Sequence, residues 1–400
     1  MSSAATTSAN LYLSELAPGS VQSEIRAMTV ACGAVDGGIN MAQGVCDTDP
    51  PHEVVDAAID AIRTGHNIYT RMEGIEALRD GIARKFASFN GLEVDPRREV
   101  LVTSGATGAL HAAVLALLNP GDECLVLEPF YGYHVSTLLS QRVKPVVVSL
   151  EAPEWKLDAA RLREAVTPKT RAIILNSPSN PSGKVFTQEE IEALAAFTIE
   201  HDLFVFTDEM YEYFIYDGEK QRSIAALPGM AERTITISGF SKTFSVTGWR
   251  LGYLAASERW TPAIGYFHDL LYVCAPSPLQ LGAAAGLATL PESFYTGLGV
   301  EYQAKRDAIC AALTKAGMTP SIPTGAYYVL ADVRHVPGAD AKQKARRLLA
   351  DTGVAAVAGS AFFGRDADGH NRGEELLRFC FAKKDAELAE ACRRLEGYRP

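Results

Sequence analysis

The chain has 400 residues, of which 47% are hydrophobic, enough for a large core divided over two or three domains. The formal net charge of −10 argues against nucleic acid or an anionic membrane as the main partner. No apolar stretch has the length that a membrane span requires. The seven scattered cysteines, without a Cys-x-x-Cys pair, favour a reducing cytoplasm and neither metal nor disulfides.

Apolar, β-branched segments alternate with helical or loop sequence through the middle of the chain. The predicted strands are Val100–Thr103, Cys124–Leu127, Pro145–Val148, Ala172–Leu175, Leu203–Phe206, Thr234–Ile237 and Leu251–Ala255. This alternation predicts an α/β fold whose large domain has a mostly parallel sheet covered by helices on both faces.

After Tyr295 the pattern changes to a long polar helix, Gly299–Lys315, followed by short strands at Ala326–Ala331 and Leu376–Phe381. These segments predict a smaller α+β domain. The predicted limits are 1–48 for an N-terminal arm that completes the small domain, 49–295 for the large domain and 296–400 for the C-terminal small domain.

The first motif in chain order is Val100-Leu-Val-Thr-Ser-Gly-Ala-Thr-Gly-Ala-Leu110, a strand, a turn of small residues and a helix. Backbone N–H groups of Gly105, Ala106 and Thr107 would face outward at the helix N-terminus, which is a phosphate-binding arrangement. The motif is neither a P-loop nor a dinucleotide fingerprint, because the glycine spacing differs and no Gly-Lys-Ser/Thr follows.

The second motif, Ile173-Ile-Leu-Asn-Ser-Pro-Ser-Asn-Pro-Ser-Gly183, is an apolar strand that enters a loop fixed by two prolines and a glycine. Pro181 restricts the backbone of Asn180, so the amide of Asn180 is held in place and can donate to a phenolate or a carboxylate. Ordinary turn chemistry explains the same residues.

In Val205-Phe-Thr-Asp-Glu-Met-Tyr211, Asp208 lies at the carboxyl end of a predicted strand, where open parallel sheets bind their ligands. A carboxylate there can pair with a protonated ring nitrogen, and Tyr211 could reach a phenolic oxygen. The alternative is an aspartate that caps the next helix.

The motif Ser238-Gly-Phe-Ser-Lys-Thr-Phe-Ser-Val-Thr-Gly-Trp-Arg250 follows the next strand and places Lys242 in a loop at its end. Burial there would favour the neutral amine, a nucleophile suited to a Schiff base, although most lysines are surface residues. Arg250 can supply charge-assisted bonds to a phosphate.

In Leu376-Leu-Arg-Phe-Cys-Phe-Ala382, alternation places Arg378 on the strand face opposite the aromatic side chains. A guanidinium fork at such a position suits a carboxylate. An arginine on the solvent face of an edge strand is an equally good interpretation.

Together, from about Asn40 to Lys383, these motifs resemble the class I/II aminotransferases, which are pyridoxal-phosphate (PLP) enzymes of fold type I. The resemblance implies that Lys242 is the Schiff-base lysine and general acid/base and that Asp208 pairs with the pyridine nitrogen. It further implies that Tyr211 and Asn180 bond the phenolic oxygen. The implied phosphate ligands are Gly105, Ala106, Thr107, Arg250 and one of the serines Ser238 or Ser241, because Gly239 stands where many relatives have a serine.

The resemblance also assigns residues around the cofactor. It implies that Tyr131 stacks on the cofactor ring, and that Arg378, with the backbone of Gly44, holds the substrate carboxylate. Tyr69 matches a tyrosine that reaches the phosphate of a neighbouring subunit, which predicts a homodimer with shared sites. A core tyrosine at 131 and a tyrosine packed ahead of a helix at 69 are the plain alternatives.

The implied activity is a PLP-dependent aminotransferase in the cytoplasm that moves an amino group between an L-amino acid and a 2-oxo acid. Another PLP reaction at the α-carbon (elimination, oxidation or cyclisation) stays open, and a non-catalytic PLP-binding regulator is disfavoured by the acidic charge. A substrate with an aromatic or neutral side chain is favoured by the aromatic residues that could form the lip of the substrate pocket. These are Tyr12, Tyr131, Tyr133, Phe362 and Phe363. Cys46 also lies in the predicted lip, where a buried structural cysteine is the simpler interpretation.

Overall fold

The computed structural model describes residues 14, 16, 23–46 and 48–399 of the chain, so Tyr12 lies outside the described residues. Its largest sheet has seven strands in the order β2-β8-β7-β6-β5-β3-β4. Their bounds are β2 Val100–Thr103, β3 Glu123–Glu128, β4 Lys144–Ser149, β5 Thr170–Asn176, β6 Phe204–Asp208, β7 Thr234–Gly239 and β8 Gly252–Ala255. Only β8 runs antiparallel to its neighbours, so the predicted α/β fold with a mostly parallel sheet is confirmed.

Alternation along the strands divides the apolar side chains between two faces of this sheet. Leu125 and Leu127 of β3 join a core that also contains residues of α6 and α7. Cys124 and Val126, which point the other way, join a core formed with α4 and α9. Because both faces are covered by helices, central residues of the strands are apolar on both faces, as in Leu125–Val126 of β3 and Ile173–Ile174 of β5.

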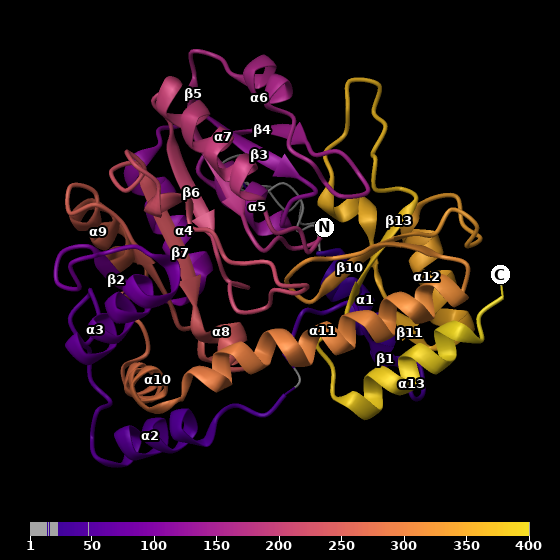
Figure 1. Ribbon diagram of the computed structural model, residues 1–400, viewed down its shortest axis with the longest axis horizontal. Helices are drawn as coiled ribbons and strands as arrows, with labels where there is room; N and C mark the ends of the chain where they lie inside the picture. The colour runs from indigo at the N-terminus through magenta and orange to yellow at the C-terminus, as the bar shows by residue number, and fades with distance from the viewer. Residues whose placement is uncertain (1–13, 15, 17–22, 47, 400) are drawn as a thin grey trace, which may run out of the picture.

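The helices follow the strands in the order expected for such a fold (Figure 1). Their bounds are α1 Glu24–Gly33, α2 His52–Arg63, α3 Glu76–Lys85, α4 Gly105–Leu117, α5 Gly132–Ser140, α6 Ala159–Ala165, α7 Gln188–Glu200, α8 Phe240–Thr243, α9 Thr261–Tyr272, α10 Ser277–Thr289, α11 Glu292–Lys315, α12 Ala341–Thr352 and α13 Asp385–Glu396. Among the described residues, no helix is both long and apolar enough to cross a bilayer.

The C-terminal part has a four-stranded antiparallel sheet in the order β12-β13-β10-β9 and a separate pair of parallel strands, β1 and β11. The bounds are β1 Ile39–Asn40, β9 Thr319–Ser321, β10 Tyr328–Asp332, β11 Val354–Ala355, β12 Val357–Ala358 and β13 Leu376–Cys380. Since β1 comes from the N-terminal segment and pairs with β11, that segment packs with the C-terminal part.

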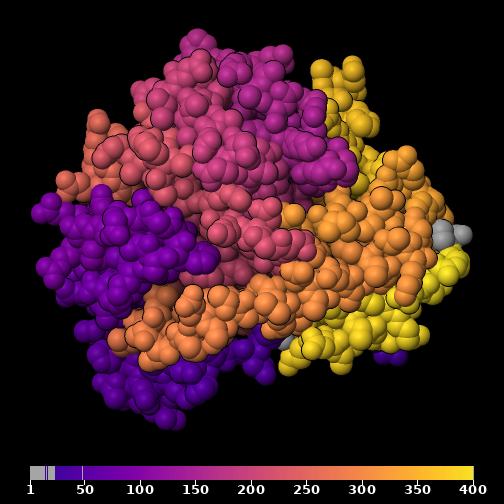
Figure 2. Space-filling view, viewed as in Figure 1, coloured from indigo at the N-terminus to yellow at the C-terminus, as the bar shows by residue number. Residues whose placement is uncertain are grey.

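Helix α11 connects the two parts of the molecule. It begins beside α10 and ends beside α13, and its residues form a continuous band along the surface in Figure 2. Near its middle, the Arg306 guanidinium makes two hydrogen bonds to the Asp217 carboxylate, at 2.5 and 2.9 Å. The helix begins seven residues before the predicted Gly299, and the predicted domain boundary at 295/296 falls inside it. The domain limits stay a prediction.

Candidate active site

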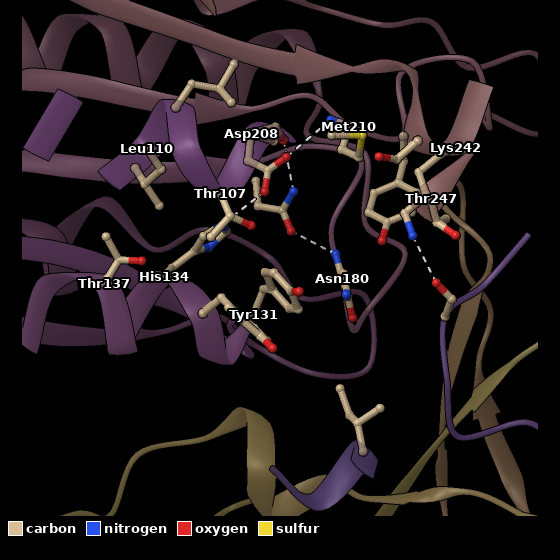
Figure 3. Close-up of a pocket in the computed structure, with 18 of the residues that line it drawn as sticks. Thr107, Leu110, Tyr131, His134, Thr137, Asn180, Asp208, Met210, Lys242 and Thr247 are labelled. Carbon is tan, nitrogen blue, oxygen red and sulfur yellow. Dashed lines mark hydrogen bonds and ion pairs between the residues drawn. The ribbon is translucent and has the colours of Figure 1, made fainter. Parts of the chain in front are cut away.

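A cavity of about 270 Å³ lies at the carboxyl ends of β5, β6 and β7, where the C-terminal part meets the large sheet (Figure 3). Parallel strands deliver their terminal side chains to a common edge, so residues far apart in sequence converge there. The residues considered below that line it are Arg26, Gly44, Ala106, Thr107, Tyr131, Tyr133, His134, Asn176, Asn180, Asp208, Met210, Tyr211, Ser241, Lys242, Arg250, Tyr328 and Arg378.

Asp208 is the last residue of β6 and is held from three sides. One carboxylate oxygen, Oδ2, lies 2.9 Å from Nε2 of the buried His134. The other, Oδ1, accepts from the backbone N–H of Met210 at 3.2 Å, and the Asp208 carbonyl accepts from the Asn176 amide at 2.8 Å. The carboxylate is therefore fixed in direction at the cavity wall, where it can face a cationic group.

Sequence reasoning missed His134. The only signal was its position three residues after Tyr131, since one helical turn brings the two side chains to the same face of α5. In the structure the two rings meet edge to face, with centroids 5.4 Å apart. Histidine at such a site reads equally well as a core residue, so its pairing with Asp208 needed the fold.

Lys242 lies on α8, a single helical turn, and not in the loop that the sequence predicted. Its amine donates a hydrogen bond to the Gly44 carbonyl at 2.9 Å. Burial lowers the pKa of Lys242, and the positive charges of Arg250 and Arg378 lower it further. The amine can therefore lose its proton more easily than that of a surface lysine.

The phosphate-type site predicted at the start of α4 has the geometry of a cradle. Gly105 has φ of +73°, and a Cβ on it would lie 2.5 Å from the Arg250 guanidinium. A Cβ on Gly252 would lie 2.6 Å from the Ala106 nitrogen, so only glycine lets these segments approach. Arg250 itself has a left-handed φ of +52°, a strained conformation of the kind that clusters at functional sites.

Arg378, at the C-terminal side of the cavity, is 1% exposed. Its guanidinium donates to the Asn180 side-chain oxygen at 2.9 Å and to the Ala42 carbonyl at 2.5 Å, and lies over the ring of Tyr328. Among the described residues it has no carboxylate partner, and its Nε has no hydrogen-bond acceptor. A buried cation in this state would gain from an incoming carboxylate.

Tyr211 and Tyr328 close the cavity floor, with their hydroxyl oxygens 2.9 Å apart. A Cβ on Gly44 would lie 1.8 Å from the Tyr328 hydroxyl oxygen, so a larger residue cannot stand at position 44. Asn180 accepts from Arg378 through its oxygen, which leaves its amide N–H groups for another acceptor.

Three of the residues predicted for the cofactor site do not line the cavity. Gly105 lies directly behind it, with Ala106 and Thr107 forming the wall. Tyr69 is 78% exposed on the surface, and its contact with a neighbouring subunit's phosphate stays a prediction. Of the two candidate serines, Ser241 lines the cavity, whereas the Ser238 hydroxyl donates to Glu212 on the far side of β7.

The predicted lip is only partly correct. Tyr133 lines the cavity beside Tyr131, with which it stacks at 5.2 Å. Phe362 and Phe363 are buried core residues, because Phe362 packs against the Arg378 guanidinium and Phe363 packs against the Trp155 ring. Cys46 is buried too, and its thiol contacts the Lys242 carbonyl at 3.5 Å. No group of three or more His, Cys, Asp or Glu among the described residues could hold a metal ion.

Comparison with known proteins identifies similar sequences and structures along nearly the whole chain. The family model described as aminotransferase class I and II matches residues 36–395. Aromatic-amino-acid aminotransferase 2 of Thermococcus litoralis is 35% identical over 376 residues, which cover 94% of this chain and 95% of the relative. Kynurenine–oxoglutarate transaminase 1 of Homo sapiens is 33% identical over 391 residues, covering 90% and 92%. The solved structure of N-succinyldiaminopimelate aminotransferase from Mycobacterium tuberculosis has a TM-score of 0.91 and 36% identity, covering 97% of this chain and 100% of that one.

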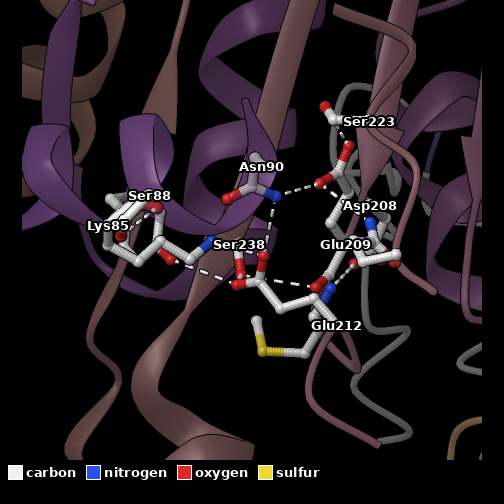
Figure 4. Close-up of polar contacts among 11 residues, drawn as sticks. Lys85, Ser88, Asn90, Asp208, Glu209, Glu212, Ser223 and Ser238 are labelled. Carbon is white, nitrogen blue, oxygen red and sulfur yellow. Dashed lines mark hydrogen bonds and ion pairs between the residues drawn. The ribbon is translucent and has the colours of Figure 1, made fainter. Parts of the chain in front are cut away.

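Behind the cavity lies a buried polar cluster of Lys85, Asn90, Glu209, Glu212 and Ser238 (Figure 4). Lys85 forms an ion pair with Glu212, and the Asn90 amide bridges the two carboxylates, at 3.0 Å from Glu209 and 3.1 Å from Glu212. Burial and the nearby Glu212 raise the pKa of Glu209 to about 7. The one lysine of the cluster thus pairs with Glu212, and Glu209 is a carboxyl that retains its proton towards neutral pH.

This cluster predicts how stability depends on pH. Glu209 binds a proton in the folded protein up to about pH 7, whereas in the unfolded chain it releases that proton near 4.5. The contribution of Glu209 to the free energy of unfolding therefore falls as the pH rises through that window, by about 3 kcal/mol. Glu209→Gln should remove this decline, so chemical denaturation at pH 5 and pH 8 should show a smaller difference for the variant than for the wild type.

The matched control is Glu164→Gln, at an exposed position on α6. It should leave the wild-type difference between the two pH values unchanged. An equal loss of stability with pH in wild type and Glu209→Gln would show that Glu209 is charged throughout.

Proposed function

Because the chain belongs to the class I and II aminotransferases, we propose that it moves an amino group between an L-amino acid and a 2-oxo acid with pyridoxal 5′-phosphate bound at Lys242. The observation that carries the proposal is one cavity that unites three groups: the Lys242 amine with its lowered pKa, the fixed Asp208 carboxylate and the buried, unpaired Arg378 guanidinium.

The residues present fit this cofactor. The glycine-lined start of α4 and Arg250 form a cationic cradle that suits a phosphate dianion. Asp208, held by His134, suits a protonated ring nitrogen, and the free amide N–H groups of Asn180 suit the phenolic oxygen. Pyridoxal phosphate, when bound, supplies an electron sink for bonds at the substrate α-carbon.

The protein's own groups then have distinct tasks. Arg378 would bind and orient the substrate α-carboxylate, which restores the ion pair that the guanidinium lacks. Lys242, as a neutral amine, would accept the α-proton and return it at the neighbouring carbon. Asp208 would accept a hydrogen bond from the ring nitrogen and so favour its protonated form. Closure of the cavity around these groups would exclude water.

The substrate class is proposed from the aromatic side chains at the cavity edge and the names of relatives, and the cellular compartment from the cysteines. Tyr131 and Tyr133 stack at the cavity edge, and relatives are named for aromatic amino acids and kynurenine, which supports an aromatic or neutral side chain. All seven cysteines are unpaired, which supports a cytoplasmic enzyme.

We further propose that the active form is a homodimer in which Tyr69 reaches the phosphate of the partner. Ile68 and Tyr69 are 80% and 78% exposed, and α9 exposes Tyr266 and Leu270. Large apolar side chains this exposed support an interface with a second copy. Helix α9 also contacts the cradle helix through Tyr272, which packs against Gly108, so it links this surface to the cavity.

The first test of the proposal is the site of cofactor attachment. Borohydride reduction of the PLP-loaded protein, followed by peptide mapping, should place the pyridoxyl group on Lys242, and Lys242→Ala should carry none. Lys184 is the internal control, since burial lowers its pKa as well but it pairs with Glu190 away from the cavity. Label on Lys184 or elsewhere instead of Lys242 would end the proposal.

The second test concerns the carboxylate anchor. Arg378→Leu should bind PLP but react with amino acids roughly two to three orders of magnitude more slowly, since a lost arginine–carboxylate pair costs about 2–5 kcal/mol. Single-turnover absorbance changes measure this rate. Arg378→Lys should recover little, and amines without a carboxylate should be affected far less. Reaction of Arg378→Leu with amino acids at the wild-type rate would move the anchor elsewhere.

The third test concerns the shared site. Tyr69→Phe should remain a dimer in sedimentation but bind PLP about tenfold more weakly, because it loses a hydrogen bond to a charged phosphate. Wild-type protein that stays fully loaded and active as a monomer at high dilution would refute the role of Tyr69.

A further inference from the structure

A buried histidine outside the cavity contacts the turn that leads into the cradle. His268, on α9, is fully buried, and its Nε2 accepts a hydrogen bond from the Ser104 backbone N–H at 3.0 Å. Ser104 connects β2 to α4, and its side chain makes no capping bond to the helix. The imidazole therefore binds the one residue between the sheet and the cradle.

This contact fixes the protonation state of the imidazole. A backbone N–H can donate only to an unprotonated nitrogen, so Nε2 carries no proton and Nδ1 carries one. Burial lowers the pKa of His268 to about 4, so the ring is neutral near pH 7. Nδ1 has no hydrogen-bond partner among the described residues. A buried N–H without an acceptor destabilises the fold, so a histidine at this position needs an explanation.

The turn that His268 holds is constrained at three consecutive positions. The Thr103 hydroxyl donates to the Gly105 carbonyl at 3.0 Å, His268 accepts from Ser104, and Gly105 takes its left-handed conformation. One helical turn further along both helices, the Tyr272 ring lies 3.3 Å from where a Cβ of Gly108 would be. Helix α9 thus braces the first turn of α4 at two points, four residues apart on each helix.

From this arrangement we propose that His268 is a positioning residue for the cofactor phosphate. By holding Ser104, it sets the direction in which the N–H groups of Ala106 and Thr107 face the cavity. This inference rests on the proposed PLP function but concerns a residue that touches neither cofactor nor substrate. It predicts that His268 affects the affinity for the phosphate group and not for the rest of the cofactor.

Two variants test the proposal, and both carry a side-chain amide but on side chains of different length. His268→Gln keeps an acceptor near the position of Nε2, whereas His268→Asn is one carbon shorter and cannot reach Ser104. Binding of PLP and of pyridoxal, which lacks the phosphate, is measured on the apoproteins by absorbance titration. His268→Asn should bind PLP about tenfold more weakly than wild type and bind pyridoxal equally well, and His268→Gln should recover most of the PLP affinity.

The outcomes separate the hypotheses. Unchanged PLP affinity in His268→Asn, or an equal loss of PLP and pyridoxal affinity, would overturn the role of His268. A wild-type protein that binds no PLP would instead refute the proposed function. If neither variant folds, the wild type decides: titration of inorganic phosphate into the apoprotein should shift the ¹⁵N signal of His268 Nε2, and saturation with phosphate without such a shift would contradict the proposal.

Discussion

The imbalance of charge in the cavity is the constraint to which the other features of the site respond. Among the lining residues that the structure describes, Arg26, Lys242, Arg250 and Arg378 are basic, and Asp208 is the one carboxylate. Burial makes the neutral form of Lys242 easier to reach, and the positive charges of Arg250 and Arg378 add to this effect. The buried Arg378 is left in need of an anion. A phosphate and a substrate carboxylate would supply the missing negative charge. The uncompensated positive charge therefore lowers the stability of the ligand-free protein and favours the binding of anionic ligands.

Most of the fold could be predicted because it depends on local patterns. Apolar strands separated by helical segments specify a parallel sheet, and the carboxyl ends of its strands then converge without further information. This is why Lys242, Asp208 and Asn180 meet in one cavity as expected. Contacts that depend on the exact direction of a side chain were not predictable: His134 against Asp208, Ser238 turned away from the cavity, and Phe362 packed under Arg378.

The segment from Asp208 to Glu212 shows the limit of a motif read from sequence alone. Asp208 and Tyr211 face the cavity, while Glu209 and Glu212 turn to the opposite side, where Glu212 pairs with Lys85 and both carboxylates accept from Asn90. The chain turns immediately after β6, so neighbouring residues of this segment point into two different environments. One is the cavity, which is open to ligands, and the other is the buried polar cluster behind it. The partners Lys85 and Asn90 come from more than a hundred residues earlier, and no local pattern marks them.

Helix α11 has a mechanical consequence. A 24-residue helix is a stiff rod about 36 Å long, and this one is fastened to both halves of the molecule and clamped at its middle by Arg306 and Asp217. The halves cannot slide freely past each other, because any relative motion must bend or twist this shared rod. We therefore expect the cavity to open by a small pivoting rotation about this helix and not by sliding of the halves.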